Sequence, residues 1–129
     1  MELNQILIVD DSATSRLIIK KCFDMAGFGS AEYREAGDGL EGLVELADRD
    51  FDLIVTDVNM PKMDGRTFVR KLKMKGIADR TSVLVITSQG DDITARSLME
   101  AGASAVLAKP ISPAKVAEVV EMIRTGGAG

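Results

Sequence analysis

The feature that most constrains this sequence is a short aliphatic run that leads into an acid. Residues 53–55 are apolar without alternation, which is typical of a strand buried on both faces of a parallel sheet. Asp57 follows, and Pro61 and Asp64-Gly65 then indicate a turn. We therefore expect Asp57 at the carboxyl end of the strand, which is the edge where open α/β sheets bind ligands. This stretch alone leaves Asp57 as a ligand, a nucleophile or a helix cap.

Four other segments are predicted to be strands. Three of them are apolar runs like the first, whereas residues 31–36 are more polar and are expected at a sheet edge with one wet face. The predicted strands are residues 6–9, 31–36, 53–57, 83–86 and 105–108.

Helical periodicity separates these strands. Helices are expected to begin at Asp38, at Asp91 or Asp92, and at Ser112, which precedes Pro113. They are expected to end at Gly27 and Gly102. The predicted helices, caps included, are residues 13–26, 38–47, 65–74, 91–101 and 112–123. The side chains expected to face the core are Leu17, Ile18, Cys22 and Met25, then Leu40, Leu43, Val44 and Ala47, then Phe68 and Leu72, and finally Val116, Val119, Val120 and Ile123.

Five strands that alternate with five helices predict an α/β fold. Such a chain forms a doubly wound, five-stranded parallel sheet with helices on both faces. The runs before Asp10, Asp57 and Thr87 are the most apolar, so the first, third and fourth strands are expected to be central. The strand order 2-1-3-4-5 fits this arrangement.

Composition excludes several classes of function. With 129 residues the chain is expected to form one domain over residues 1–125, followed by a flexible tail, 126–129. A net charge of −4 argues against direct binding of nucleic acid, and no apolar run is long enough for a membrane span or a signal peptide, so we expect a cytoplasmic protein. Cys22 is the only cysteine and the chain has no histidine, which excludes disulfides, Cys/His zinc sites and histidine-based triads.

Parallel strands bring their carboxyl ends to one edge, and here that edge collects Asp10, Asp11, Asp57, Thr87 and Lys109. Three carboxylates repel one another unless a cation lies among them. Oxygen ligands without histidine or cysteine suit Mg²⁺. The ion and Lys109 together carry three positive charges, which a phosphoryl group of roughly −1.5 to −2 would balance alongside the acids.

These residues predict phosphoryl transfer to an aspartate. We assign Asp57 as the nucleophile that forms an acyl phosphate. Asp10 and Asp11 are assigned as the carriers of Mg²⁺, one of which could act through water, and Asp57 is assigned as a further ligand of the ion. Lys109 would hold one phosphoryl oxygen, and the Thr87 hydroxyl would donate to another. Asp11 could also cap the helix that follows.

Asn59, two residues after the nucleophile, could complete the metal shell with its main-chain carbonyl. Its side chain and that of Gln89 are expected to tune the lifetime of the phosphorylated state.

Several motifs, in order along residues 4–124, resemble the receiver domain of bacterial two-component response regulators. They are Asp10-Asp11 after a strand, Asp57 with Met60-Pro61-x-x-Asp64-Gly65, Thr87 after a strand, and Ala101-Gly102-Ala103 leading to Lys109-Pro110. The resemblance implies a flavodoxin-like fold, Mg²⁺-dependent phosphorylation of Asp57 by a histidine kinase or phosphotransfer protein, and self-catalysed dephosphorylation. It also implies a phosphoacceptor switch without activity on external substrates, a cis Lys109–Pro110 bond, and a face of the fourth helix, fifth strand and fifth helix that binds a downstream protein.

Val106 departs from the family pattern, which has an aromatic residue three positions before the lysine. Because a valine has little to move, the switch is expected to rest on Thr87 and the loop at residues 90–92. Gly90, Ala95, Val106, Ala108 and Val119 predict a small, aliphatic signalling face.

The favoured function is a single-domain response regulator, and Asp57-x-Asn59-Met60-Pro61 favours a chemotaxis regulator. The alternatives are a receiver cut from a longer regulator, or a phosphorelay intermediate. A Mg²⁺-dependent phosphohydrolase is disfavoured because Asn59 stands where a second acid would protonate a leaving group. A flavin-binding module is disfavoured because a flavin phosphate requires backbone N–H groups and hydroxyls rather than acids.

Overall fold

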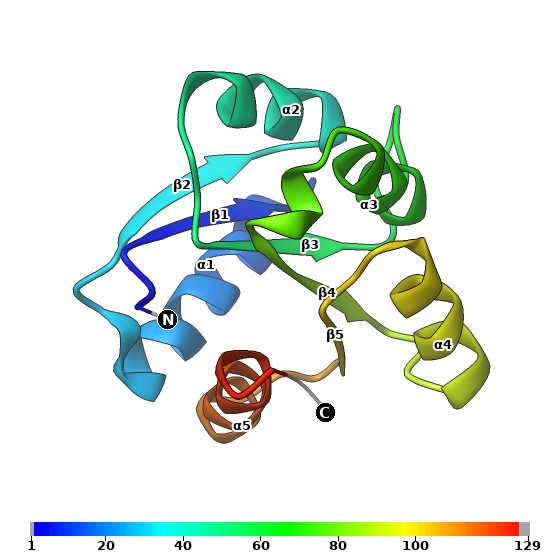
Figure 1. Cartoon of the computed structure of the whole chain (residues 1–129). Helices are drawn as coiled ribbons and strands as arrows, with labels where there is room; N and C mark the ends of the chain where they lie inside the picture. The colour runs from blue at the N-terminus through cyan, green and yellow to red at the C-terminus, as the bar shows by residue number, and fades with distance from the viewer. Residues whose placement is uncertain (1, 127–129) are drawn as a thin grey trace.

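A computed structural model of the chain, described here for residues 2–126, contains one parallel sheet (Figure 1). Its strand order is β2-β1-β3-β4-β5, which confirms the predicted order. The strands are β1 (Gln5–Val9), β2 (Glu32–Ala36), β3 (Leu53–Asp57), β4 (Ser82–Thr87) and β5 (Ala105–Ala108). Of the predicted tail, residues 127–129 lie outside the described part of the chain.

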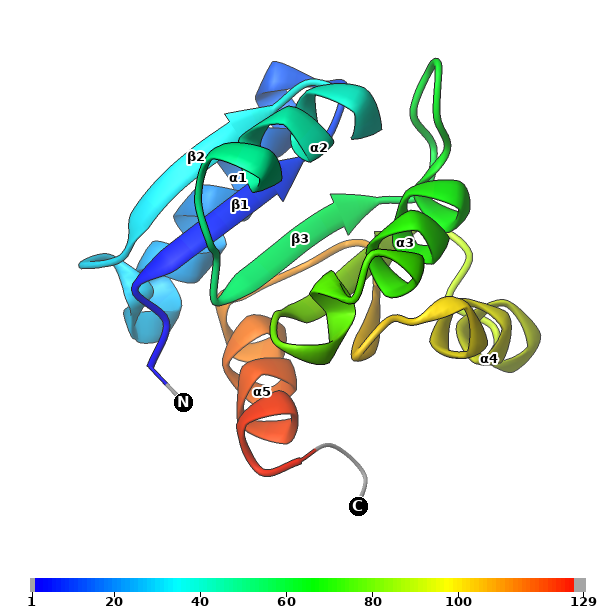
Figure 2. The same cartoon turned by 45° about the horizontal axis from the view of Figure 1, so that its top comes forward.

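The helices cover both faces of the sheet (Figure 2). One apolar cluster joins α2, α3 and α4 to one face, and a second joins α1 and α5 to the other. Between residues 2 and 126, no helix has the length and hydropathy needed to span a membrane. The helices are α1 (Ala13–Phe23) with a π-helical turn (Asp24–Phe28), α2 (Gly39–Asp48), α3 (Gly65–Met74), a 3₁₀ turn (Ile77–Asp79), α4 (Asp92–Ala101) and α5 (Pro113–Arg124).

The central strands are buried on both faces, as their unbroken apolar runs predict. Along β1, Leu7 and Val9 enter the cluster under α2, α3 and α4, while Ile6 and Ile8 enter the cluster under α1 and α5. This alternation follows from the two-residue period of a strand. β2 and β5 are the two edge strands, and the burial pattern of β2 is mixed as expected.

The prediction for the buried face of α1 was largely wrong. Leu17, Ile18 and Met25 are exposed, and the buried side chains are Ile19, Cys22 and Phe23. Ile19 and Phe23 are four residues apart and therefore lie on one side of the helix. Residues 18 and 22 form an apolar pair four positions apart, and so do residues 19 and 23. Periodicity alone therefore could not decide which side of the helix is buried.

The prediction for the buried face of α2 was largely wrong, for a different reason. Val44 is 70% exposed and Leu40 also faces solvent, whereas the helix approaches the sheet by its glycines. A Cβ atom at Gly42 would lie 3.1 Å from Cζ of Phe68 and 3.3 Å from Cγ2 of Val9. Of the other two predicted residues, Leu43 does pack against the core, and Ala47 is exposed. The glycines allow α2 to lie closer to the sheet than leucine side chains on that face would.

The other three helices confirm their predictions. Phe68 and Leu72 of α3 are fully buried, as are Val116 and Val120 of α5. Each long helix begins with a side-chain cap that accepts a hydrogen bond from the main-chain N–H three residues on. These caps are Ser12, Asp38, Asp64, Asp91 and Ser112. Asp11, weighed as a possible cap of α1, is not its N-cap.

Candidate functional site

Strand register brings the predicted site residues to one edge of the sheet. Val9 of β1 pairs with Thr56 of β3, so Asp10 and Asp57 follow side by side. Thr87 ends β4 opposite Ala108, which precedes Lys109. The arrowheads in Figure 2 show how neighbouring strands end toward the same side.

Three acids meet at this edge. One carboxylate oxygen from each of Asp10, Asp11 and Asp57 lies within 4.8 Å of the other two. Asp10 is 1% exposed and Asp57 is 6% exposed, while Asp11 faces solvent. The Nζ of Lys109 lies 3.5 Å from Oδ2 of Asp57. The Lys109–Pro110 bond is cis, as the resemblance implied.

Burial raises the pKa of Asp57 above its ordinary value. Lys109 opposes this effect by lowering the pKa, and the negative charge of Asp10 raises it further. The N–H of Val58 donates to Oδ1 of Asp57 over 2.8 Å. The ionised acid is therefore only partly stabilised by the protein. A hard divalent cation fits this all-oxygen, electron-rich set of donors.

Asp10 is held by contacts that the sequence analysis missed. Its Oδ1 accepts from the N–H of Ser12 over 2.9 Å, and its Oδ2 accepts from the Ser15 hydroxyl over 2.5 Å. Arg16 donates to the main-chain carbonyl of Asp10 and also to Oε1 of Glu35 on β2. The hydroxyl one turn into the helix after Asp10 is the signal that could have indicated this network.

The turn after β3 requires a glycine at position 65. Its N–H donates to the carbonyl of Val58 over 2.7 Å, and a Cβ atom there would collide with the carbonyl oxygen of Asp57. This contact packs the first turn of α3 against the end of β3. Lys62 in the same turn has a φ of 67° and its Nζ lies 3.7 Å from Oδ2 of Asp38. The loops after β2 and β3 are thus tied together near the acids.

Thr87 and Asn59 occupy different environments. Thr87 is buried at the end of β4, and its Oγ1 accepts from the N–H of Gln89 over 3.0 Å. Its hydroxyl proton remains available for donation. Asn59 is exposed in the loop that follows β3. The structure thus brings Thr87 to the same sheet edge as the acids and leaves Asn59 beside it in the loop.

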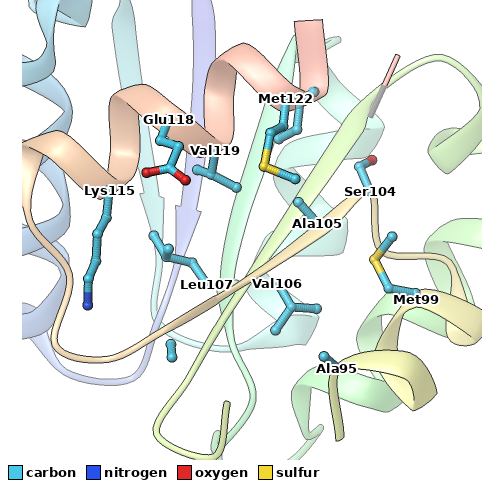
Figure 3. A pocket seen from close by; sticks show the side chains of 12 residues that line it. Ala95, Met99, Ser104, Ala105, Val106, Leu107, Lys115, Glu118, Val119 and Met122 are labelled. Atoms are coloured by element: carbon cyan, nitrogen blue, oxygen red, sulfur yellow. The ribbon is translucent and has the colours of Figure 1, made fainter. Parts of the chain in front are cut away.

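A second candidate site is a groove of about 500 Å³ between α4 and α5, over β5. Figure 3 shows Val106 pointing into it from β5, with Ala95 and Met99 on one side and Val119 and Met122 on the other. Lys115 and Glu118 lie at its rim. Ala95, Val106, Ala108 and Val119 of the predicted aliphatic face line this groove, and Gly90 is not among its lining residues.

Comparison with known proteins decides the family. Residues 6–121 match the model of the response regulator receiver domain. The chain belongs to this family. It is 33% identical to the probable chemotaxis protein CheY of Rhizobium etli over 119 residues, which cover 92% of this chain and 91% of the relative.

Solved receiver structures share the fold. CheY4 of Vibrio cholerae aligns with a TM-score of 0.82 and 30% identity, over 95% of this chain and 99% of that one. CheY of Borrelia burgdorferi, solved in a complex with CheX, BeF₃ and Mg²⁺, aligns with a TM-score of 0.81 and 27% identity, over 94% and 89% of the two chains. The protein is a receiver domain that resembles chemotaxis response regulators, and receivers of this kind are phosphoacceptor switches.

Proposed function

We propose that Asp57 accepts a phosphoryl group from a histidine kinase or phosphotransfer protein in a Mg²⁺-dependent reaction. The observation that carries the proposal is the position of Asp57, which is buried at the sheet edge between Lys109 and the acids Asp10 and Asp11. A nucleophile in that position has its attacking oxygen aligned with groups that can neutralise an incoming phosphate.

In the proposed reaction, a carboxylate oxygen of Asp57 forms a bond to phosphorus as the bond from phosphorus to the donor nitrogen breaks. The leaving imidazole takes up a proton. Lys109 then neutralises one phosphoryl oxygen, and the Thr87 hydroxyl donates to another. Asp10, Asp11, Asp57 and the main-chain carbonyl of Asn59 would hold Mg²⁺, which when bound would screen the charge of the acids and the phosphate.

The same groups would serve self-catalysed dephosphorylation, with water as the nucleophile and Asp57 as the leaving carboxylate. The side chains of Asn59 and Gln89 lie beside the site in the chain, and we propose that they control the entry of that water. The protein is then a switch that removes its own phosphoryl group. We propose that the receiver domain comprises residues 1–125 and that it acts in the cytoplasm.

The proposal is tested by the intact mass of the protein after incubation with acetyl phosphate, with and without Mg²⁺. We expect one added phosphoryl group in the wild type with Mg²⁺, and none in Asp57→Asn. The matched control is Asp50→Asn, which removes an acid whose side chain is 90% exposed and should leave the adduct intact. An adduct that forms equally without Mg²⁺ would contradict the role of the metal.

We further propose that the phosphorylated state is read at the α4–β5–α5 face by a protein partner, as part of a chemotaxis pathway. The groove over Val106 and the similarity to chemotaxis regulators support this assignment. A receiver within a longer regulator, or a phosphorelay intermediate, is the alternative.

Chemical shifts of the amides around Val106 and Val119 should move when beryllofluoride and Mg²⁺ are added. The control is Val44 on α2, which lies outside the groove and should not move. Changes confined to the acidic edge would contradict signalling through this face.

A further inference from the structure

The contact between Ser15 and Asp10 has no part in the roles assigned above. Asp10 is almost completely buried, so its carboxylate depends on protein donors for the hydrogen bonds that water would otherwise supply. The two donors are the N–H of Ser12, on Oδ1, and the hydroxyl of Ser15, on Oδ2. With one donor on each oxygen, the plane of the carboxylate is fixed.

We infer that Ser15 is a positioning residue for the divalent ion, acting through Asp10. A carboxylate that is held in advance does not lose rotational freedom when it takes a metal or a metal-bound water. Each oxygen of Asp10 accepts one bond and keeps a further lone pair for the metal shell. Partners of this kind orient metal ligands, and their removal typically weakens metal binding by about 10–100-fold.

The local structure separates this role from helix capping. The cap of α1 is Ser12, whose Oγ accepts from the main-chain N–H of Ser15. That bond uses the backbone of Ser15 and is unaffected when the hydroxyl is removed. The side chain of Ser15 can thus be changed while the cap and the bond from the N–H of Ser12 to Asp10 remain.

The test is the dissociation constant for Mg²⁺, measured by isothermal titration calorimetry on the full chain. We expect Ser15→Ala to bind Mg²⁺ about tenfold more weakly than the wild type. The decisive pair is Ser15→Thr and Ser15→Val, which are both β-branched and differ by a hydroxyl in place of a methyl group. Ser15→Thr should bind Mg²⁺ about as well as the wild type, and Ser15→Val should bind it as weakly as Ser15→Ala.

Two controls on the same helix complete the experiment. Thr14→Ala removes an exposed hydroxyl that lies outside the Asp10 network, and Ser12→Ala removes the cap. Thr14→Ala should leave the dissociation constant unchanged. Ser12→Ala keeps the main-chain N–H that donates to Asp10, so it should weaken Mg²⁺ binding less than Ser15→Ala does. Thermal unfolding in EDTA should show every variant folded.

The inference rests on the proposed Mg²⁺-dependent function, and the outcomes separate the two. If the wild type binds Mg²⁺ and the Thr and Val variants bind it equally, the inference is wrong while the proposed function stands. Equal weakening by Ser12→Ala would assign the effect to the helix end and would also overturn it. A wild type that binds no Mg²⁺ would overturn both.

Discussion

Strand β3 buries two kinds of side chain within five residues. Leu53, Ile54 and Val55 are fully buried among other apolar groups, and their burial stabilises the fold. Asp57, at the end of the same strand, is nearly as buried, yet burial raises its pKa and makes its ionised form costly. The comparison shows that similar burial has opposite effects on stability at the core and at the functional edge.

The largest loss of stability is expected in the core. Phe68→Ala should lower the free energy of unfolding by about 3–5 kcal/mol, because the ring is fully buried and its loss leaves a cavity in the core. Urea unfolding measures this change. A loss below about 1 kcal/mol would mean that α2 collapses onto the vacated space, and that the core is less rigid than the comparison requires.

At the edge, Mg²⁺ should stabilise the protein by relieving the repulsion between Asp10, Asp11 and Asp57. At a concentration of 100 times its dissociation constant, a ligand of the folded state adds about 2.7 kcal/mol. Thermal unfolding with Mg²⁺ and with EDTA measures the difference. Ca²⁺ is the comparison ion, and we expect it to stabilise less because Mg²⁺ suits a site with few carboxylates.

The destabilisation caused by the buried charge of Asp57 can also be removed without a metal. In EDTA at neutral pH, Asp57→Asn should be more stable than the wild type, because it has no buried charge to ionise. The folded-state pKa of Asp57 is raised, so ionisation destabilises the wild type fully above that pKa. The penalty shrinks as the pH falls through the folded-state pKa and is gone below the unfolded-state pKa. The two unfolding curves should converge in acid. A variant that is less stable at neutral pH would contradict the comparison.

A surface cap should contribute less than the core. Asp64 caps α3 by accepting from the N–H of Thr67 over 2.8 Å, and this bond lowers the pKa of Asp64. Asp64→Ala should cost about 1 kcal/mol at neutral pH. A lowered folded-state pKa means that the contribution is present above the unfolded-state pKa and is lost as the pH falls through the folded one. Urea unfolding at neutral and acidic pH tests this dependence.

The smallest effect is expected on the exposed side of α2. Val44→Lys should change the free energy of unfolding by no more than about 0.5 kcal/mol, because the side chain is mostly in solvent. The same urea experiment measures it. A loss of several kcal/mol would show that the leucine-valine side of α2 is buried after all, as the sequence had predicted.

Most of the fold could be predicted because each central strand carries two signals in the sequence. Each central strand is an unbroken apolar run, and each ends in a residue that a binding site needs, such as Asp10, Asp57 or Thr87. Register is then set by the parallel sheet, which places those residues at one edge. The helix boundaries followed from local signals such as Ser112 before Pro113.

What could not be predicted depends on tertiary contacts. The apolar period of α2 suited Leu40 and Val44, but the close approach of Phe68 to Gly42 decides which side of the helix is buried. The hydrogen bond from Ser15 to Asp10 likewise depends on how the first turn of α1 folds back over the end of β1. A sequence pattern indicates which residues lie on the same side of a helix. It does not indicate which side will be buried against the neighbouring elements.

The most direct test of the account is to locate the phosphorylated residue. The protein is treated with acetyl phosphate and Mg²⁺, then reduced with borohydride, which converts an aspartyl phosphate to homoserine, and the peptides are sequenced by mass spectrometry. We predict homoserine at Asp57 alone, with none when Mg²⁺ is omitted. Homoserine at Asp10 or Asp11, or at no acid of the cluster, would contradict the claim that this edge positions Asp57 as the phosphoacceptor.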